Sequence, residues 1–344
     1  MSSRPDTTPA ERGSDWPGVR LHVVTGKGGT GKTTVASALA LALASEGRTV
    51  LLCEVEGRQG IARMFDVEPL PYAERRIATG LGHAGAPAGS VHALHIDPES
   101  ALLEYLSMYY KLGRAGRALD RFGVIEFATT IAPGVRDVLL TGKVYEAVQR
   151  NSRNRGAVAY DAVVLDAPPT GRIAQFLNVN SELAGLAKVG PIKSQADKVM
   201  TLLRSPRTAV HLVTVLEEMP VQETADGIDD LVAAGLPVGG IVVNLLRPRG
   251  LSEVQLAHAR EGSTDRETVL RGLALAGVED PARLVDGLLE EAQDHAVRRA
   301  LEDEQSALVA ELDRPTYELP RLAAGVDLGG LYELAARLKD QGMA

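Results

Sequence analysis

Cysteine is nearly absent from this chain of 344 residues, which contains only Cys53. A single cysteine cannot form a disulfide within the chain, and it cannot build a metal site from cysteines alone. Because Cys53 lies in an apolar run, we expect it to be a small buried hydrophobic residue rather than a reactive thiol. We therefore expect no iron–sulfur cluster and no zinc ion held by cysteines alone.

Long hydrophobic segments and an excess of basic residues are also lacking. No run of about twenty apolar residues occurs, so we expect no direct membrane insertion. The formal net charge is −8 and no long basic run appears, which argues against nucleic-acid binding. Residues 1–18 are polar and have no signal-peptide core, so we expect a disordered tail on a cytoplasmic protein.

A glycine-rich segment near the amino terminus matches the phosphate-binding loop G-x-x-x-x-G-K-S/T. It reads Gly26-Lys27-Gly28-Gly29-Thr30-Gly31-Lys32-Thr33, and Thr34 follows. An apolar strand-like run precedes the loop and an Ala- and Leu-rich helical run follows it, which is the expected context. Backbone N–H groups would surround phosphate oxygens at the positive end of the helix dipole. Lys32 would reach the β- and γ-phosphates of ATP, and Thr33 would bind Mg²⁺.

Further strand-like runs recur along the chain with helical patterns between them. They lie at residues 48–55, 90–96, 161–166, 208–215, 240–245 and 315–320. This alternation predicts an α/β fold of the P-loop NTPase type, with a mostly parallel sheet and helices on both faces. Two mainly helical stretches, 98–151 and 181–207, interrupt the alternation, and we expect them to form an inserted helical subdomain. We also expect a long helix over about 281–312.

The additional lysine of the loop, Lys27, narrows the class of P-loop protein. With it, the loop resembles the deviant Walker A motif of a branch that includes ArsA, MinD, ParA and the nitrogenase iron protein. The resemblance implies a dimer, in which Lys27 of each subunit contacts the phosphates bound by the other. Such a lysine acts as an arginine finger does, because it stabilises negative charge on the transferred phosphoryl group.

A second motif selects one family within this branch. The stretch Asp166-Ala167-Pro168-Pro169-Thr170-Gly171 resembles the Asp-Thr-Ala-Pro-Thr-Gly switch of ArsA and of the tail-anchored-protein targeting ATPase. Asp166 ends an apolar run, where a Walker B acid holds Mg²⁺ directly or through water. By the same resemblance, Asn244 binds adenine and Pro320 begins a loop that closes over the base. Residues 19–344 are thus expected to be one ArsA-like, Mg²⁺-dependent ATPase domain.

The chain departs from this family in switch I, where the family has Asp-Pro-Ala-His and its Asp acts on the attacking water. Here Glu56-Gly57-Arg58-Gln59 takes that place. Glu56 is the candidate base, and Glu54, nearer the strand end, is the alternative. An extra methylene can misplace a base and reduce the rate by orders of magnitude, so the turnover rate stays open.

The family's metal-binding cysteines have no counterparts either. His295 and Arg298 occupy the positions of the zinc-binding pair of the targeting ATPase, and arginine cannot bind zinc. The cysteines that bind metalloids in ArsA are also missing, which argues against arsenite extrusion.

The resemblance therefore implies a nucleotide-gated dimeric switch, formed with a second copy or with a paralogous subunit. A hydrophobic protein cargo on the helical subdomain is one possible partner, although core packing explains its Leu and Tyr residues better. An interaction module with little turnover, such as the weak half of a heterodimer, remains an alternative. A P-loop kinase, a metallocluster carrier and a MinD- or ParA-like positioning factor fit less well, the last because of the acidic charge and the short helical run at 331–339.

Overall fold

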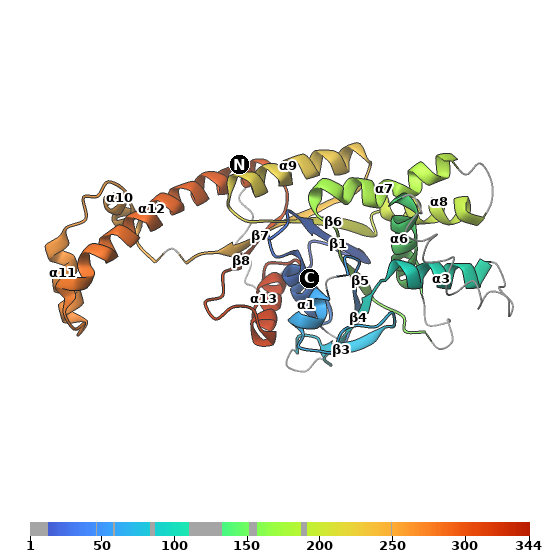
Figure 1. Ribbon diagram of the computed structural model, residues 1–344, viewed down its shortest axis with the longest axis horizontal. Helices are drawn as coiled ribbons and strands as arrows, with labels where there is room; N and C mark the ends of the chain where they lie inside the picture. Colours follow the sequence, from blue (N-terminus) through green and yellow to red (C-terminus); the bar gives the residue numbers. More distant parts are fainter. Residues whose placement is uncertain are drawn as a thin grey trace.

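A computed structural model of the chain describes residues 13–45, 47–57, 59–82, 87–109, 133–150, 157–186, 191–248 and 250–344. Its centre is an eight-stranded sheet (Figure 1). The strands are β1 (Leu21–Gly26), β2 (Thr49–Glu54), β3 (Arg75–Thr79), β4 (Ser90–His95), β5 (Ala162–Asp166), β6 (Thr208–Thr214), β7 (Val238–Leu246) and β8 (Thr316–Pro320). They lie in the order β3-β4-β2-β5-β1-β6-β7-β8, and every neighbouring pair is parallel except β3 with β4. The expected α/β fold with a mostly parallel sheet is confirmed.

Seven of these strands coincide with the apolar runs recognised in the sequence. β3 was not predicted, because this antiparallel edge strand is polar and its residues Arg75, Arg76 and Thr79 are exposed. An edge strand pairs on one side only, and charged side chains on it are common because they prevent association with other strands.

Helices cover both faces of the sheet, as the near-continuous apolar strands predict. One face carries α1 (Lys32–Leu43), α2 (Gly60–Met64) and α13 (Leu328–Asp340). The other carries α6 (Pro133–Gln149), α7 (Thr170–Leu186), α8 (Pro191–Leu203) and α9 (Glu218–Ala233). Helix α1 contacts both the sheet and α13, so every residue from Val35 to Leu43 is buried.

The two segments expected to form a helical subdomain contribute α3 (Pro98–Tyr109), α6 and α8. Helix α3 packs on α6, and α6 and α8 pack on α7, so these four helices lie together at one end of the sheet (Figure 1). Leu102 is buried there, whereas Leu103 is 40% exposed. Residues 110–132, which belong to the same expected subdomain, lie outside the described residues.

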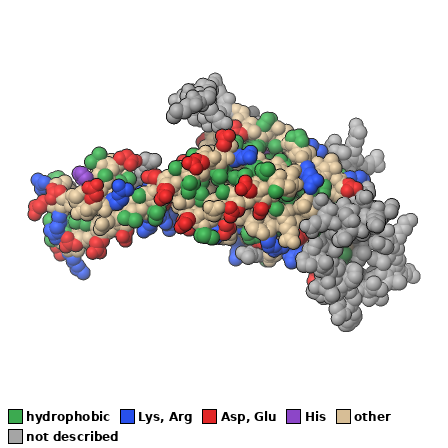
Figure 2. Space-filling view, turned by 90° about the horizontal axis from the view of Figure 1, so that it is seen from above, with side chains coloured by type: hydrophobic (Ala, Val, Ile, Leu, Met, Phe, Trp, Pro, Cys, Tyr) green, Lys and Arg blue, Asp and Glu red, His purple; other side chains and the backbone are tan. Residues whose placement is uncertain are grey.

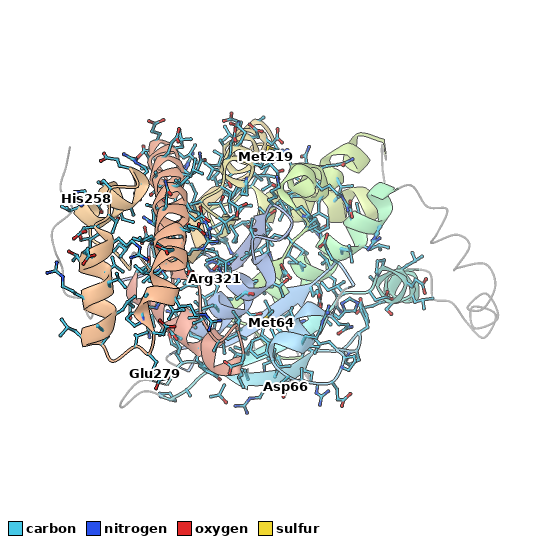
Figure 3. The ribbon with its side chains drawn as sticks, turned by 60° about the vertical axis from the view of Figure 1, so that its left-hand side comes forward. Met64, Asp66, Met219, His258, Glu279 and Arg321 are labelled. Carbon is cyan, nitrogen blue, oxygen red and sulfur yellow. The ribbon has the colours of Figure 1, made fainter. Side chains whose placement is uncertain are left out.

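Three further helices project from the opposite end of the sheet and form what we call the arm, residues 250–311 (Figure 1). They are α10 (Glu253–Arg260), α11 (Arg266–Leu275) and α12 (Pro281–Glu311), of which only the long α12 was predicted. Figure 3 labels His258 on α10 and Glu279 just before α12. A small cluster of Leu256, Ala259 and Ala296 joins α10 to α12, and no residue of α11 is buried. Among the described helices, none combines the length and the apolar character needed to cross a bilayer.

The expected tail, residues 1–18, lies partly outside the described residues, which begin at residue 13. The backbone N–H of Asp15 donates to the carbonyl of Gly342 (2.7 Å). The indole Nε1 of Trp16 donates to the Tyr317 hydroxyl (2.9 Å), which in turn donates to the Asp15 carboxylate (2.8 Å). Residues 13–18 are thereby attached to β8 and to the carboxyl terminus.

Candidate nucleotide-binding site

The glycine-rich loop joins the carboxyl end of β1 to α1, at the edge of the parallel sheet where ligands of open α/β folds bind. Three of its glycines have positive φ: Gly26 (156°), Gly29 (91°) and Gly31 (89°). A β-carbon on Gly26 would lie 2.2 Å from the Val213 carbonyl oxygen, so this position also needs glycine for space. Gly28 and Gly29 are exposed, and a β-carbon added to either would have no neighbouring atom within 4 Å. The loop is therefore open to a ligand.

The loop is held in a curled form by hydrogen bonds to one carbonyl oxygen, that of Lys27. The Thr30 hydroxyl donates to it at 2.9 Å and the Thr30 N–H at 3.4 Å. The ammonium of Lys32 also lies 3.5 Å from this oxygen, over the loop. The cation is therefore already placed at the concave side of the loop, where phosphates would lie.

Thr33 and Asp166 meet at the base of the loop. Asp166 ends β5, which pairs directly with β1, and its Oδ2 accepts a hydrogen bond of 2.6 Å from the Thr33 hydroxyl. Burial is the main cause that raises the pKa of the Asp166 carboxyl to about 7. The hydrogen bond from Thr33 and the charge of Lys32 act in the opposite direction, whereas the negative charges of Glu54 and Glu56 raise this pKa further.

These residues fit the Mg²⁺ and ATP that the sequence implies. A hydroxyl beside a carboxylate is a pair of oxygen ligands, which Mg²⁺ prefers. A divalent cation would also offset the mutual repulsion of the three carboxylates at residues 54, 56 and 166. The open glycine loop with Lys32 above it provides the amide groups and the cation that bind phosphates.

The two switch I carboxylates have different environments. Glu54, the last residue of β2, is 2% exposed, and its Oε1 accepts a hydrogen bond of 2.8 Å from the Gly60 N–H. Glu56 is half-buried and makes no hydrogen bond or ion pair with the described residues. Arg58 of the same loop lies outside the described residues. Of the two candidates, only Glu56 has both carboxylate oxygens without a hydrogen-bond partner among the described residues.

Lys27 does not lie over the loop but is paired with a residue of α9. Its Nζ is 2.8 Å from Oε1 of Glu223, and both side chains are about one-third exposed (29% and 34%). The other oxygen of Glu223 accepts a 3.3 Å hydrogen bond from the hydroxyl of Thr170, which lies in the motif at residues 166–171. Glu223 thus connects Lys27 of the phosphate loop to Thr170, which follows β5.

Asn244 and Pro320 occupy different parts of the same edge. The amide of Asn244, near the end of β7, is buried and donates to the Thr30 carbonyl oxygen (2.9 Å), so it braces the phosphate loop. Leu245, the next residue, has a φ of 60°, a conformation that L-residues rarely adopt. Pro320 ends β8 and is in register with Leu246 of β7, which lies two residues after Asn244.

Three contact residues of the site were not recognised in the sequence: Gly60, His95 and Glu223. Gly60 and Glu223 lie in segments without a distinctive motif, and His95 ends an ordinary apolar strand. His95 and Glu223 reach the site because strands and helices that are distant in the sequence are adjacent in the fold, whereas Gly60 directly follows the switch I stretch. No pattern within the sequence indicates these contacts.

Comparison with known proteins agrees with this geometry. Residues 19–206 match the family described as anion-transporting ATPase (ArsA). The chain is 54% identical over 332 residues to the ATPase BagA of Mycobacterium tuberculosis. The aligned residues cover 95% of this chain and 96% of that protein. It is 25% identical over 279 residues to the ATPase get3 of Neurospora crassa (70% and 78% covered). It is also 25% identical over 261 residues to the ATPase GET3 of Kluyveromyces lactis (66% and 72%). The chain belongs to the ArsA family of anion-transporting ATPases.

Proposed function

We propose that this protein is a Mg²⁺-dependent ATPase that acts as a nucleotide-gated dimeric switch in the cytoplasm, where ATP is available. The observation that carries the proposal is the Thr33–Asp166 contact at the base of an intact phosphate loop. The loop supplies phosphate binding, and the contact supplies a site for the cation that phosphoryl transfer requires.

The chain's residues have separate roles in the proposed reaction. Lys32 and the loop amides would hold the β- and γ-phosphates. Thr33 and Asp166 would hold Mg²⁺, which would supply positive charge beside the phosphate oxygens. Glu56 takes a proton from the attacking water as its oxygen bonds to the γ-phosphorus. The bond from this phosphorus to the bridging oxygen breaks, and ADP leaves with the electron pair.

Lys27 supplies the connection between subunits in this proposal. In the described subunit its ammonium is neutralised by Glu223. On dimer formation it would exchange this carboxylate for the phosphates held by the partner, where a cation stabilises the charge of the transition state. The partner is a second copy or a paralogous subunit, and a hydrophobic protein on the helical subdomain is the proposed cargo. Cys53 is wholly buried, so it cannot bind a metalloid at the surface.

Phosphate release by the purified protein with Mg²⁺-ATP tests this function, with Lys27→Ala and Glu56→Gln as variants. We expect each variant to bind ATP within about threefold of wild type and to release phosphate at least about tenfold more slowly. Turnover that survives both substitutions would contradict the inter-subunit mechanism.

A nucleotide-binding module with little turnover is the second candidate. It is favoured by one observation, the half-buried Glu56 at the position where the family has an aspartate that acts on water. Under this function, the wild type binds ATP and dimerises but releases no phosphate above background. A Glu56→Asp variant that gains turnover would then identify the missing geometry.

A further inference from the structure

Glu54 is a buried carboxylate that the proposed reaction does not use. Only one of its oxygens is satisfied, through the 2.8 Å hydrogen bond from the Gly60 N–H. Its Oε2 is buried and has no hydrogen-bond partner among the described residues. Burial of a carboxylate is unfavourable unless the group is paired or hydrogen-bonded, so a role that retains it is expected.

The strand register places Glu54 in a row of titratable residues. Asp166 of β5 and His95 of β4 are its direct neighbours on either side. The Nδ1 of His95 is 3.8 Å from Oε2 of Glu54, and this nitrogen is also buried without a hydrogen-bond partner among the described residues. The distance is too long for a hydrogen bond, but the two groups face each other and attract when the histidine is protonated.

The contact between Glu54 and Gly60 closes the switch I loop at its base. The chain leaves β2 at Glu54 and enters α2 at Gly60, and residues 55–59 between them include Glu56. A carboxylate at one end of the loop thus binds a backbone amide at the other. Glu56 lies only two residues from this contact, so the position of its carboxylate depends on the hydrogen bond.

Two more contacts hold the end of the switch I loop that leads into α2. Gly60 lies close to Thr33, the candidate Mg²⁺ ligand. A β-carbon on Gly60 would be 3.2 Å from the Thr33 methyl group. The side-chain amide of Gln59 donates to the Leu70 carbonyl (3.1 Å) and accepts from the Leu70 N–H (2.8 Å). The loop end is therefore fixed, and the Glu54 carboxylate connects it to the strand that also borders Asp166.

We propose that Glu54 is a positioning residue that holds the switch I loop so that Glu56 faces the reacting water. One oxygen of Glu54 binds the Gly60 N–H, and the other faces the ring of His95. The proposal rests on the hydrolysis proposed above, and it assigns Glu54 a role other than that of the base. The base must be reached by water, whereas Glu54 is enclosed and already accepts a backbone hydrogen bond.

Two substitutions of similar volume separate this role from mere packing. Glu54→Gln keeps an oxygen that accepts from the Gly60 N–H, and its new amide can donate to Nδ1 of His95. Glu54→Met fills the same space but has no acceptor. We expect Glu54→Met to lower kcat at least about tenfold, the usual effect of losing such a supporting contact, with the Kd for ATP within about threefold. We expect Glu54→Gln to keep kcat within about threefold of wild type.

Hydrogen exchange of the Gly60 amide provides a readout that does not depend on turnover. We expect exchange about tenfold faster in Glu54→Met than in Glu54→Gln, which corresponds to loss of one hydrogen bond. Equal exchange rates, an unchanged kcat in Glu54→Met, or an equal loss of kcat and ATP affinity would each overturn the proposal. If the wild type binds ATP without releasing phosphate, the proposed hydrolysis fails instead, and the exchange rates alone decide whether Glu54 holds the loop.

Discussion

Single residues of the phosphate loop are constrained by their close neighbours as well as by the ligand they would bind. Gly31 has a φ of 89°, and a β-carbon on it would lie 2.4 Å from the Asn244 amide nitrogen. That nitrogen is the donor that braces the loop at Thr30. The glycine is therefore required by backbone conformation and by the packing of β7 against the loop.

Gly31→Ala tests this requirement, and Gly28→Ala is its matched control in the same loop. We expect Gly31→Ala to lower the free energy of unfolding by about 2 kcal/mol, because left-handed backbone disfavours a β-carbon and the Asn244 contact is displaced. Gly28 has no positive φ, and a β-carbon added to it would have no neighbouring atom within 4 Å. Its substitution is therefore expected to change stability by less than about 0.5 kcal/mol. Urea unfolding without nucleotide measures both, and equal effects would contradict the explanation.

A pair of buried histidines below the loop links β1 to β6. The Gly240 N–H donates to Nδ1 of His211 (3.1 Å), so this nitrogen is the acceptor and Nε2 carries the proton. Nε2 of His211 then donates to Nδ1 of His22 (3.1 Å). Burial lowers the pKa of His22 to about 4 and holds the pKa of His211 well below its usual value.

The histidine pair predicts that acid destabilises the nucleotide-free protein. Below about pH 6.5 the unfolded chain binds a proton on each histidine, whereas folded His22 does so only near pH 4. Each histidine therefore removes about 1.4 kcal/mol of stability per pH unit in this window. Asp166 acts in the opposite direction, since its raised pKa makes the folded state bind a proton below about pH 7. For these three groups together, the sum is a loss of about 1.4 kcal/mol per pH unit.

Unfolding by urea at several values between pH 7 and 4.5 measures this slope. Asp166→Asn removes the opposing contribution and is expected to make the slope about twice as steep. The exposed His258→Gln is the control and is expected to keep the wild-type slope. A stability that is constant or rises toward pH 4.5 in Asp166→Asn would refute the prediction.

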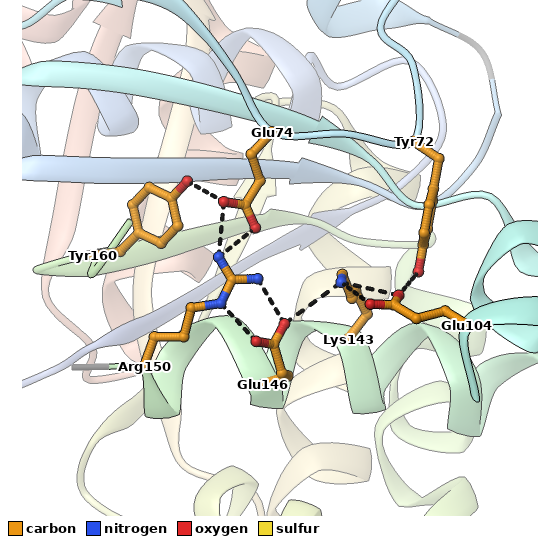
Figure 4. A network of polar contacts seen from close by, with 7 residues as sticks. All are labelled: Tyr72, Glu74, Glu104, Lys143, Glu146, Arg150 and Tyr160. Carbon is orange, nitrogen blue, oxygen red and sulfur yellow. Dashed lines mark hydrogen bonds and ion pairs between the residues drawn. The ribbon is translucent and has the colours of Figure 1, made fainter. Parts of the chain in front are cut away.

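At the scale of elements, a polar network attaches the helical end of the molecule to the sheet (Figure 4). It consists of Tyr72, Glu74, Glu104, Lys143, Glu146, Arg150 and Tyr160. Lys143 of α6 and Arg150, which directly follows this helix, alternate with the three carboxylates, so each cation has two acidic partners. Helices α3 and α6 are thereby joined to the segment that follows switch I and to Tyr160, two residues before β5.

The arm contrasts with this end, because its own core is small. Leu256 of α10 is 8% exposed and packs with Ala259 and Ala296, whereas Leu275 of α11 is 89% exposed. We expect Leu256→Ala to destabilise α10 locally by about 2 kcal/mol, the lower end for a buried leucine, without changing ATP affinity. Hydrogen exchange along α10 and nucleotide binding measure the two effects. Leu275→Ala is the control, and equal exchange in both variants would contradict this assignment of the core.

The whole molecule has an uneven distribution of charge. The arm contains six arginines and fourteen Asp or Glu residues, so it carries the entire formal net charge of −8. The rest of the chain is formally neutral. Acidic side chains are scattered over the projecting arm, as Figure 2 shows. The acidic balance therefore describes the arm and not the surface around the nucleotide site.

The Lys27–Glu223 pair predicts how self-association depends on nucleotide, given the proposed dimer. The pair is partly exposed, so its loss is expected to change stability by less than about 1 kcal/mol. Glu223→Gln frees Lys27 for the partner's phosphates, and we expect dimers at an about threefold lower protein concentration with Mg²⁺-ATP. Glu218→Gln, an exposed acid on the same helix, is the control. Sedimentation measures both, and an equal or weaker association of Glu223→Gln would disprove this role.

Much of the fold was predictable because strands, helices and loops follow local patterns. The phosphate loop needs only neighbouring glycines, Lys32 and Thr33, and seven strands are apolar runs bounded by helical patterns. The edge strand β3 and helices α10 and α11 were not recognised, since they are polar and exposed and bury too little to show a periodic pattern. Asp166 was recognised as a strand-end acid, although its partner was not determined by that position.

The sequence by itself determined the phosphate loop, the family and the departure at Glu56, because each is carried by consecutive residues. The tertiary structure decided which residues meet. It brings Thr33 to Asp166 across 133 positions, because β5 pairs with β1, and it places Glu54 between Asp166 and His95 through the strand register. It also pairs Lys27 with Glu223 and places residues 250–311, which carry the net negative charge, in a projecting arm. Such contacts depend on strand order and helix packing, which are set by burial across the whole chain rather than by neighbouring residues.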